Sequence, residues 1–346
     1  MGSSIPQPAS CAERGAILRT VTRPRTRILQ RLLPWAVSAA CLGWVFGHAT
    51  DWQALRAATR DANLPLFIAL TTLDKLIFFL WWGVLQAAAV RRFVMPVSSR
   101  EVIAIRGGAE LVRGVNGALA DATFMYGVAQ LARGRSGAVA AAVGVPILCH
   151  FLVLLVQVTL ALGLLASGRL ADRDVVIAVG AGWAVLAASA LALRLGWWRG
   201  LLSKTPMRAL VQNLSVRALL PFLGWFCLLA AFDVLIQGLA SRAFGVPIAW
   251  AALAARIPIF YVLISAPSFG NFGTRELAWA TLFADQGPRN TLIAYGLATN
   301  TVFLILHVVI GVAFLPRALA LIAEVRRARR EGREIPELPL HDASDP

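Results

Sequence analysis

Residues 267 to 276 read PSFGNFGTRE and interrupt a long apolar segment that runs from residue 247 to residue 285. Gly270 and Gly273 allow the backbone to turn sharply and to approach other groups closely. Glu276 then falls in the first turn of the helix that follows. The stretch predicts a loop that opens into a helix inside an apolar segment, with free backbone amides that favour an anion.

The composition of the whole chain is that of an integral membrane protein. Of the 346 residues, 58% are hydrophobic and only 15% are charged, against roughly 25% charged residues in a soluble domain. The net charge of +15 does not indicate a nucleic-acid partner, because the basic residues lie between the apolar runs. A spanning helix needs about 20 largely apolar residues. Six stretches qualify: 32 to 49, 64 to 90, 137 to 166, 175 to 196, 213 to 240 and 290 to 316.

Two further apolar stretches, 102 to 131 and 247 to 285, are interrupted near their middles by polar and helix-breaking residues. Positively charged loops stay on the cytoplasmic side of a membrane. If both stretches are re-entrant hairpins, 21 of the 33 basic residues fall on that side. The sequence therefore predicts an all-α integral membrane protein with six full transmembrane helices, two re-entrant helical hairpins and both termini in the cytoplasm.

This topology divides the chain into three parts. A basic cytoplasmic tail, 1 to 31, precedes a single transmembrane domain, 32 to 316, and a second cytoplasmic tail, 317 to 346, follows it. Within the domain, the halves 64 to 166 and 213 to 316 repeat the order helix, hairpin, helix in opposite orientation. An inverted repeat with broken helices that meet near the midplane is the usual architecture of secondary transporters.

Residues of the same type recur in the two halves at a nearly constant sequence separation. In the hairpins, Gly114 and Gly117 lie 156 residues before Gly270 and Gly273. Ionisable groups at membrane depth are costly and usually functional, and four of them show a similar echo: Asp74 with Asp233, and His150 with His307. These four are candidates for a coupling role. For the histidines, a proton relay and a hydrogen-bonded structural role both remain open.

Polar residues near the two hairpin tips are the candidate substrate-binding residues: Arg113, Asn116, Asp121, Arg256, Asn271, Arg275 and Glu276. Two guanidinium groups, those of Arg256 and Arg275, flank the second helix start and suit a phosphate. Arg113 either clamps a phosphate or neutralises Glu110, which lies one turn earlier. Glu276 either faces a hydrated cavity or complements the helix dipole and pairs with a nearby arginine.

Asp74 and Lys75 are adjacent in a predicted helix, so their side chains point in different directions and do not neutralise each other. At least one of them needs a partner from another segment. Asp233, with Gln237 one turn later, forms a polar stripe on an otherwise apolar helix.

Motifs of soluble enzymes and metal sites are absent from the sequence. It contains no H-E-x-x-H, no P-loop and no G-x-S-x-G motif, and the four histidines do not cluster. The four cysteines are scattered, with no C-x-x-C pair. We therefore expect neither a cofactor nor a metal.

The second hairpin and the helix after it resemble a known signature. Pro267, Gly270, Gly273 and Glu276 are similar to the Pro, Gly, Gly and Glu arrangement in the transmembrane, flippase-like domain of the lysylphosphatidylglycerol synthase family. The resemblance covers residues 30 to 316. In the first hairpin that family carries a Pro and an Arg followed by a Gly-Glu pair, whereas the run from Arg113 lacks the proline and that glutamate.

The resemblance implies a protein of the bacterial inner membrane that moves amino-acylated or other polar lipids between leaflets. In fused members a soluble aminoacyl transferase follows this domain, and the residues after Pro316 are too few to form one, so we expect translocation without synthesis. Membrane lipids are the expected partners, and a lipid-biosynthetic enzyme is a further candidate. Two alternatives stay open: a membrane-embedded enzyme that acts on a lipid-linked substrate, and an accessory protein beside a lipid or glycan synthase.

Overall fold

The computed structural model describes residues 36, 39 to 40, 43, 52 to 132, 136 to 164, 173 to 195, 216 to 265 and 268 to 331. These residues form helices joined by turns, with no strand among them. From residue 52 onward, the described helices are α2 (Trp52–Asp61), α3 (Leu64–Phe93), α4 (Ser99–Arg113), α5 (Gly117–Leu131), α6 (Ser136–Leu164), α7 (Arg173–Arg194), α10 (Val216–Ala243), α11 (Trp250–Ile264), α12 (Thr274–Leu282) and α13 (Arg289–Arg330).

Four of the described helices are long and apolar enough to cross a membrane: Leu64–Phe93, Ser136–Gly163, Arg217–Ala243 and Arg289–Ala328. They correspond to four of the six predicted spans. The apolar part of α7, Val179–Ala192, is shorter, and most of the stretch 32 to 49 lies outside the described residues. The prediction of an all-helical chain with several candidate membrane-spanning helices is confirmed.

The outer surfaces of the long helices carry many large apolar side chains. Leu160, Val185 and Val312 are each more than half exposed, and similar residues occur along α3 and α10. A soluble monomer rarely exposes contiguous apolar surface on this scale. Such a surface is suited to contact with the acyl chains of lipids.

Each of the two interrupted stretches folds into a pair of short helices joined by a turn, α4 with α5 and α11 with α12. Polar side chains cap the starts of two of these helices, α4 and α5. Ser98 Oγ accepts a hydrogen bond from the Arg100 amide at the start of α4, and Asn116 Oδ1 accepts one from the Leu119 amide at the start of α5. Such caps satisfy amides that a new helix would otherwise leave unpaired.

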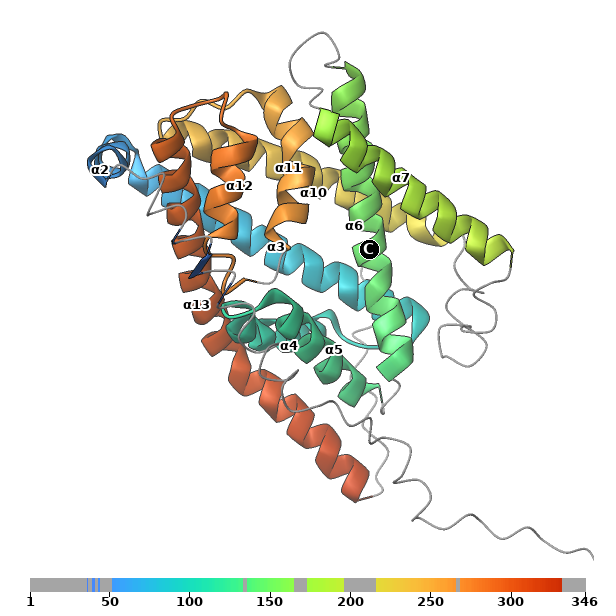
Figure 1. Cartoon of the computed structure of the whole chain (residues 1–346). Helices are drawn as coiled ribbons and strands as arrows, with labels where there is room; N and C mark the ends of the chain where they lie inside the picture. Colours follow the sequence, from blue (N-terminus) through green and yellow to red (C-terminus); the bar gives the residue numbers. More distant parts are fainter. Residues whose placement is uncertain are drawn as a thin grey trace, which may run out of the picture.

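The order long helix, short pair, long helix occurs twice, first in α3 to α6 and then in α10 to α13. In Figure 1 the pair α4–α5 lies below α3 and the pair α11–α12 lies above it. The tips of the two pairs meet between them, where the Gly270 amide donates a hydrogen bond to the Val115 carbonyl at 3.1 Å. The sequence places these two residues in different halves.

Helix α13 runs past both pairs and packs closely along α4. A Cβ at Gly107 would collide with Phe314, and one at Gly311 would collide with Leu111. Small residues at such positions let two helix backbones approach each other. The helix continues through Pro316 to Arg330, beyond the predicted end of the last span.

Apolar clusters surround the tips on both sides. One cluster, around Trp279, Tyr295 and Phe244, joins α11, α12 and α13, and a second, around Phe124 and Val102, joins α4 and α5. Polar and charged side chains gather between these clusters. This polar layer contains the candidate site.

Candidate functional site

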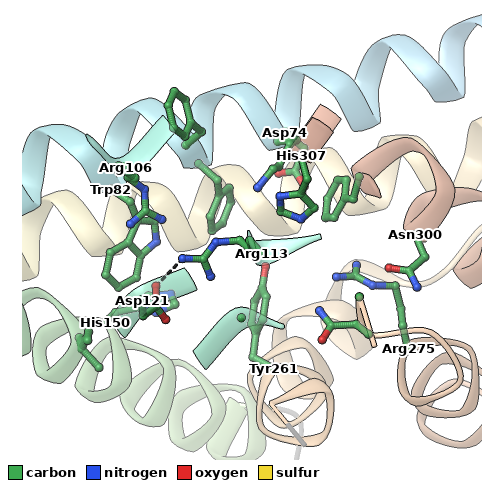
Figure 2. A pocket seen from close by; sticks show the side chains of 18 of the residues that line it. Asp74, Trp82, Arg106, Arg113, Asp121, His150, Tyr261, Arg275, Asn300 and His307 are labelled. Atoms are coloured by element: carbon green, nitrogen blue, oxygen red, sulfur yellow. Dashed lines mark hydrogen bonds and ion pairs between the residues drawn. The ribbon is translucent and has the colours of Figure 1, made fainter. Parts of the chain in front are cut away.

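A cavity of about 390 Å³ lies between the two helix pairs (Figure 2). Side chains from both halves line it: Asp74, Lys75, Phe78, Phe79, Trp82, Gln86, Arg106, Arg113, Gly117, Asp121, Ile147, His150, Tyr261, Gly270, Asn271, Arg275, Asn300, Phe303 and His307. Both charged groups and aromatic rings are among its lining residues. The cavity therefore combines ionic recognition with surfaces that accept apolar groups.

A cluster of charges on the first-half side is centred on Glu110, whose side chain is 1% exposed. Glu110 Oε2 contacts Lys75 Nζ at 2.7 Å and His307 Nδ1 at 2.7 Å, and its Oε1 accepts a hydrogen bond from Arg113 Nε at 3.0 Å. Arg113 also forms an ion pair with Asp121. Lys75 thus has its partner on another helix, as the sequence predicts, and Arg113 neutralises Glu110 while still facing the cavity.

Arg106 is buried in the same cavity, at 8% exposure, without a carboxylate partner. One of its terminal nitrogens donates to Gln86 Oε1 at 2.7 Å, and its Nε has no hydrogen-bond partner. The guanidinium lies 5.7 Å from the centre of the Trp82 ring and 5.9 Å from that of Phe124. Among the described ion pairs none involves Arg106.

Sequence reasoning missed Arg106 and Gln86. Arg106 lies inside α4 and Gln86 inside α3, away from the hairpin tip that the glycines and polar residues mark. The sequence does contain a signal for Arg106, because an arginine stands within the apolar stretch 102 to 131. An ionisable residue at membrane depth is a functional candidate wherever it falls in the hairpin.

Arg275 is the corresponding buried guanidinium of the second half, at 5% exposure. It packs against the rings of Phe303, at 4.9 Å, and Phe260, at 5.6 Å. Its Nε has no hydrogen-bond partner, and no described carboxylate lies within ion-pair distance. Figure 2 shows Arg275 and Arg106 on opposite sides of the view, with Arg113 between them.

Two buried carboxylates come from equivalent helices of the two halves. Asp74 on α3 lines the cavity and is 4% exposed, and Asp233 on α10 is 2% exposed. The Tyr261 hydroxyl donates to Asp233 Oδ2 at 2.8 Å. One turn along α10, Gln237 Oε1 accepts from the Tyr295 hydroxyl at 2.7 Å. The predicted polar stripe is therefore part of a buried hydrogen-bonded layer.

Both candidate histidines reach the cavity. His307 contacts Glu110, as described above, which gives it a structural partner. His150 lies among aromatic rings, with its centre 5.3 Å from that of Trp82 and 5.1 Å from that of Phe226.

Glu276 does not face a hydrated cavity, so that expectation is wrong. Its side chain is fully buried, and its Oε2 accepts a hydrogen bond from the Gly273 amide at 2.6 Å. The carboxylate thus satisfies an amide at the positive end of the α12 dipole, which is the alternative that the sequence left open. No described arginine pairs with it.

Arg256 lies away from the cavity, which corrects its assignment to the binding site. It forms a two-pronged ion pair with Asp285 in the loop between α12 and α13, with one N–O distance of 3.0 Å. This hydrogen bonding lowers the pKa of Asp285 below its ordinary value. Asn116 is also a structural residue, since its side chain caps α5 and does not line the cavity.

The four hairpin glycines have different positions. Gly117 and Gly270 line the cavity, Gly114 ends α4, and Gly273 precedes α12. Gly270 has φ +53, and a Cβ there would lie 2.8 Å from the Gly114 carbonyl oxygen. The turn is completed by Asn271, which lines the cavity with φ +62.

We expect Gly270→Ala to destabilise the fold more than Gly245→Ala. Both positions have φ in the left-handed region, which costs about 1 to 2 kcal/mol for a residue with a Cβ, but a Cβ at Gly245 has nothing within 4 Å. Gly245→Ala therefore measures backbone strain alone, and the difference reports the contact between the tips. Thermal unfolding of the purified variants in one detergent provides the measurement. Equal losses would show that the tips are not held together.

Among the described residues, no group of three or more His, Cys, Asp or Glu side chains is placed to hold a metal ion. Comparisons with protein-family models, with curated proteins and with solved structures found no match. The resemblance to the lysylphosphatidylglycerol synthase family therefore stays a prediction from sequence.

Proposed function

We propose that this protein moves lipids with a polar, anionic headgroup between the two leaflets of the bacterial inner membrane. The observation that carries the proposal is the pair of buried, cavity-facing guanidinium groups, Arg106 and Arg275, that lack a carboxylate within ion-pair distance. A buried cation that makes no direct ion pair or full set of hydrogen bonds is incompletely stabilised. An anionic ligand in the cavity supplies the direct contact that both guanidinium groups lack.

Phosphate is the anion that fits this arrangement best. Guanidinium groups bind phosphate oxygens through two parallel hydrogen bonds, and both Arg106 and Arg275 keep an Nε–H that no described group accepts. The aromatic rings of Trp82 and Phe303 line the same cavity. They offer apolar surface to the glycerol and acyl carbons next to a lipid headgroup.

The proposal includes the topology that the sequence predicts, namely six full spans, two re-entrant hairpins in an inverted repeat, and both termini in the cytoplasm. Two observations support it. The helix pairs lie on opposite sides of α3 (Figure 1), and their tips meet at the hydrogen bond between Gly270 and Val115. Non-helical backbone at membrane depth needs protein or water around it, and the tips have both a partner and a polar cavity.

A membrane-embedded enzyme is the second candidate, because two histidines and two carboxylates, Asp74 and Asp121, line one cavity. Against it, Glu110 contacts three basic side chains, and Asp121 pairs with Arg113. These groups are held as ion pairs and are not free to act as acids or bases.

The test uses purified protein in sealed vesicles that contain fluorescent, acyl-labelled phosphatidylglycerol. Dithionite destroys the label in the outer leaflet, so protein-dependent movement appears as additional loss of fluorescence. We expect faster movement of this anionic lipid than of equally labelled phosphatidylcholine. Movement no faster than in protein-free vesicles would overturn the proposal. Chemical conversion of the lipid in detergent would favour the enzyme.

A further inference from the structure

The buried charges around the cavity are unbalanced on both sides, with one positive charge in excess on the first-half side and one negative charge in excess on the other. On the first-half side, Lys75 and Arg113 contact Glu110, and Arg113 also contacts Asp121, so two cations meet two carboxylates. Arg106 adds a positive charge that faces the cavity. The second-half side carries Asp233 and Arg275 of the second half together with Asp74, which reaches it from α3, and the two carboxylates interact electrostatically with each other and with the guanidinium.

None of the three charged groups on the second-half side forms an ion pair with a described residue. Each has an atom without a hydrogen-bond partner: Asp74 Oδ1, Asp233 Oδ1 and Arg275 Nε. Their side chains are 2% to 5% exposed. Water therefore solvates these charges poorly, and the surplus of one negative charge has to be compensated in another way.

The other polar groups that face the two carboxylates supply one further cation, Lys75, which is already paired with Glu110. From α11 the Tyr261 hydroxyl donates to Asp233, from α13 Tyr295 faces both carboxylates, and from α10 Gln237 lies one turn from Asp233. Lys75 follows Asp74 on α3 but contacts Glu110. Arg275 on α12 is thus the sole cation that faces the pair within the described residues and has no carboxylate contact of its own.

We propose that Asp74 and Asp233 together hold one proton, and that this proton moves with the lipid. Two buried like charges that interact with each other are not both ionised when Arg275 is the one cation left to balance them. A proton from water leaves one carboxylate to balance Arg275 and makes the other a hydroxyl donor. Asp74 and Tyr261 line the cavity, so the pair exchanges its proton with the space that admits the headgroup.

Coupling to the lipid follows from the position of Arg275, and this part rests on the proposed function. When an anionic headgroup binds Arg275, it neutralises the cation that faces the two aspartates. The pair then holds its proton more tightly, and by linkage a protonated pair binds the headgroup more tightly. One proton and one anionic headgroup therefore cross together.

The proton site is testable without any lipid transport. Infrared spectra of the purified full chain in nanodiscs at neutral pH are expected to show the C=O band of a buried, protonated carboxyl group, shifted in D₂O. Asp74→Asn and Asp233→Asn should each remove this band, because the remaining carboxylate balances Arg275. Asp285→Asn, in the loop after α12, is the matched control and should keep it. A wild-type band that survives both substitutions overturns the proposal.

The coupling is tested in the phosphatidylglycerol vesicles under a pH gradient. One proton per lipid predicts that one pH unit changes the leaflet ratio at steady state by about tenfold, and that Asp74→Asn makes the ratio insensitive to the gradient. Asp233→Glu keeps a carboxyl group, so its leaflet ratio should respond to the pH gradient like that of the wild type. This variant provides the comparison if an asparagine variant fails to fold. Lipid movement that ignores the gradient, or follows sodium at fixed pH, overturns proton coupling. Absence of lipid movement overturns the proposed function instead, and the infrared band still decides the proton site.

Discussion

Replacing Glu110 by glutamine is expected to remove most of the folded protein. Glu110 is 1% exposed and contacts Lys75, Arg113 and His307, which come from α3, its own helix and α13. The substitution leaves Lys75 buried without its anion. Breaking a buried ion pair by removing one partner costs about 3 to 5 kcal/mol, which is a large part of the stability of most proteins.

Thermal unfolding in detergent and the monodisperse fraction after purification measure this effect. Asp285→Asn is the control, because it breaks an ion pair whose carboxylate is 51% exposed, and exposed pairs contribute about 0 to 1 kcal/mol. The double variant Glu110→Gln with Lys75→Met removes both charges of the buried pair and should recover part of the loss. If the single variant is as stable as Asp285→Asn, Glu110 does not hold the three helices together.

The sequence predicts which segments form helices and turns, but it does not predict which side chains contact one another. Apolar length predicted α3, α6, α10 and α13, because a run of that length has few other solutions. Glycine and asparagine near residues 114 to 117 and 270 to 273 predicted the turns inside the interrupted stretches. These signals are local, so a single chain is enough to interpret them.

Partners depend on which faces meet in space, and here the sequence misled in two places. Arg256 lies in the apolar helix α11 near the predicted hairpin tip, but its guanidinium pairs with Asp285, which lies 29 residues later in the sequence. Glu276 stands beside a glycine turn in a polar run, yet packing buries it completely against its own helix start. Conversely, Gln86 and Arg106 are 20 residues apart on different helices, and nothing local links them.

The contact between the tips gives the two halves a common boundary. Gly270 and Val115 hydrogen bond there, and directly beside them Arg113 of one half and Asn271 of the other both line the cavity. A ligand in the cavity therefore contacts both halves at once. This is the arrangement that alternating access requires, since binding energy gained from both halves biases how one moves against the other.

Replacing Arg106 by glutamine is expected to reduce movement of labelled phosphatidylglycerol by about ten- to a hundredfold, since a hydrogen bond to a charged group contributes about 1.5 to 3 kcal/mol. Arg106 faces the cavity, is 8% exposed and has only Gln86 as a polar partner within the described residues. Neutral glutamine removes an unpaired buried charge, so the fold should lose little stability. Arg106→Lys keeps the charge without the planar fork and should lie between wild type and glutamine.

Arg256→Gln is the matched control for this substitution. It removes a guanidinium that the sequence also placed at the binding site but that pairs with Asp285 away from the cavity, so transport should stay near the wild-type rate. Expression and unfolding temperature are compared for all variants, because the prediction concerns rate per folded protein. A normal rate in Arg106→Gln together with a slow rate in Arg256→Gln would place the headgroup outside the cavity. Equal slowing of phosphatidylcholine, which carries the same phosphate beside a choline cation, would show that Arg106 contacts the phosphate or shapes the path without selecting for a net negative charge.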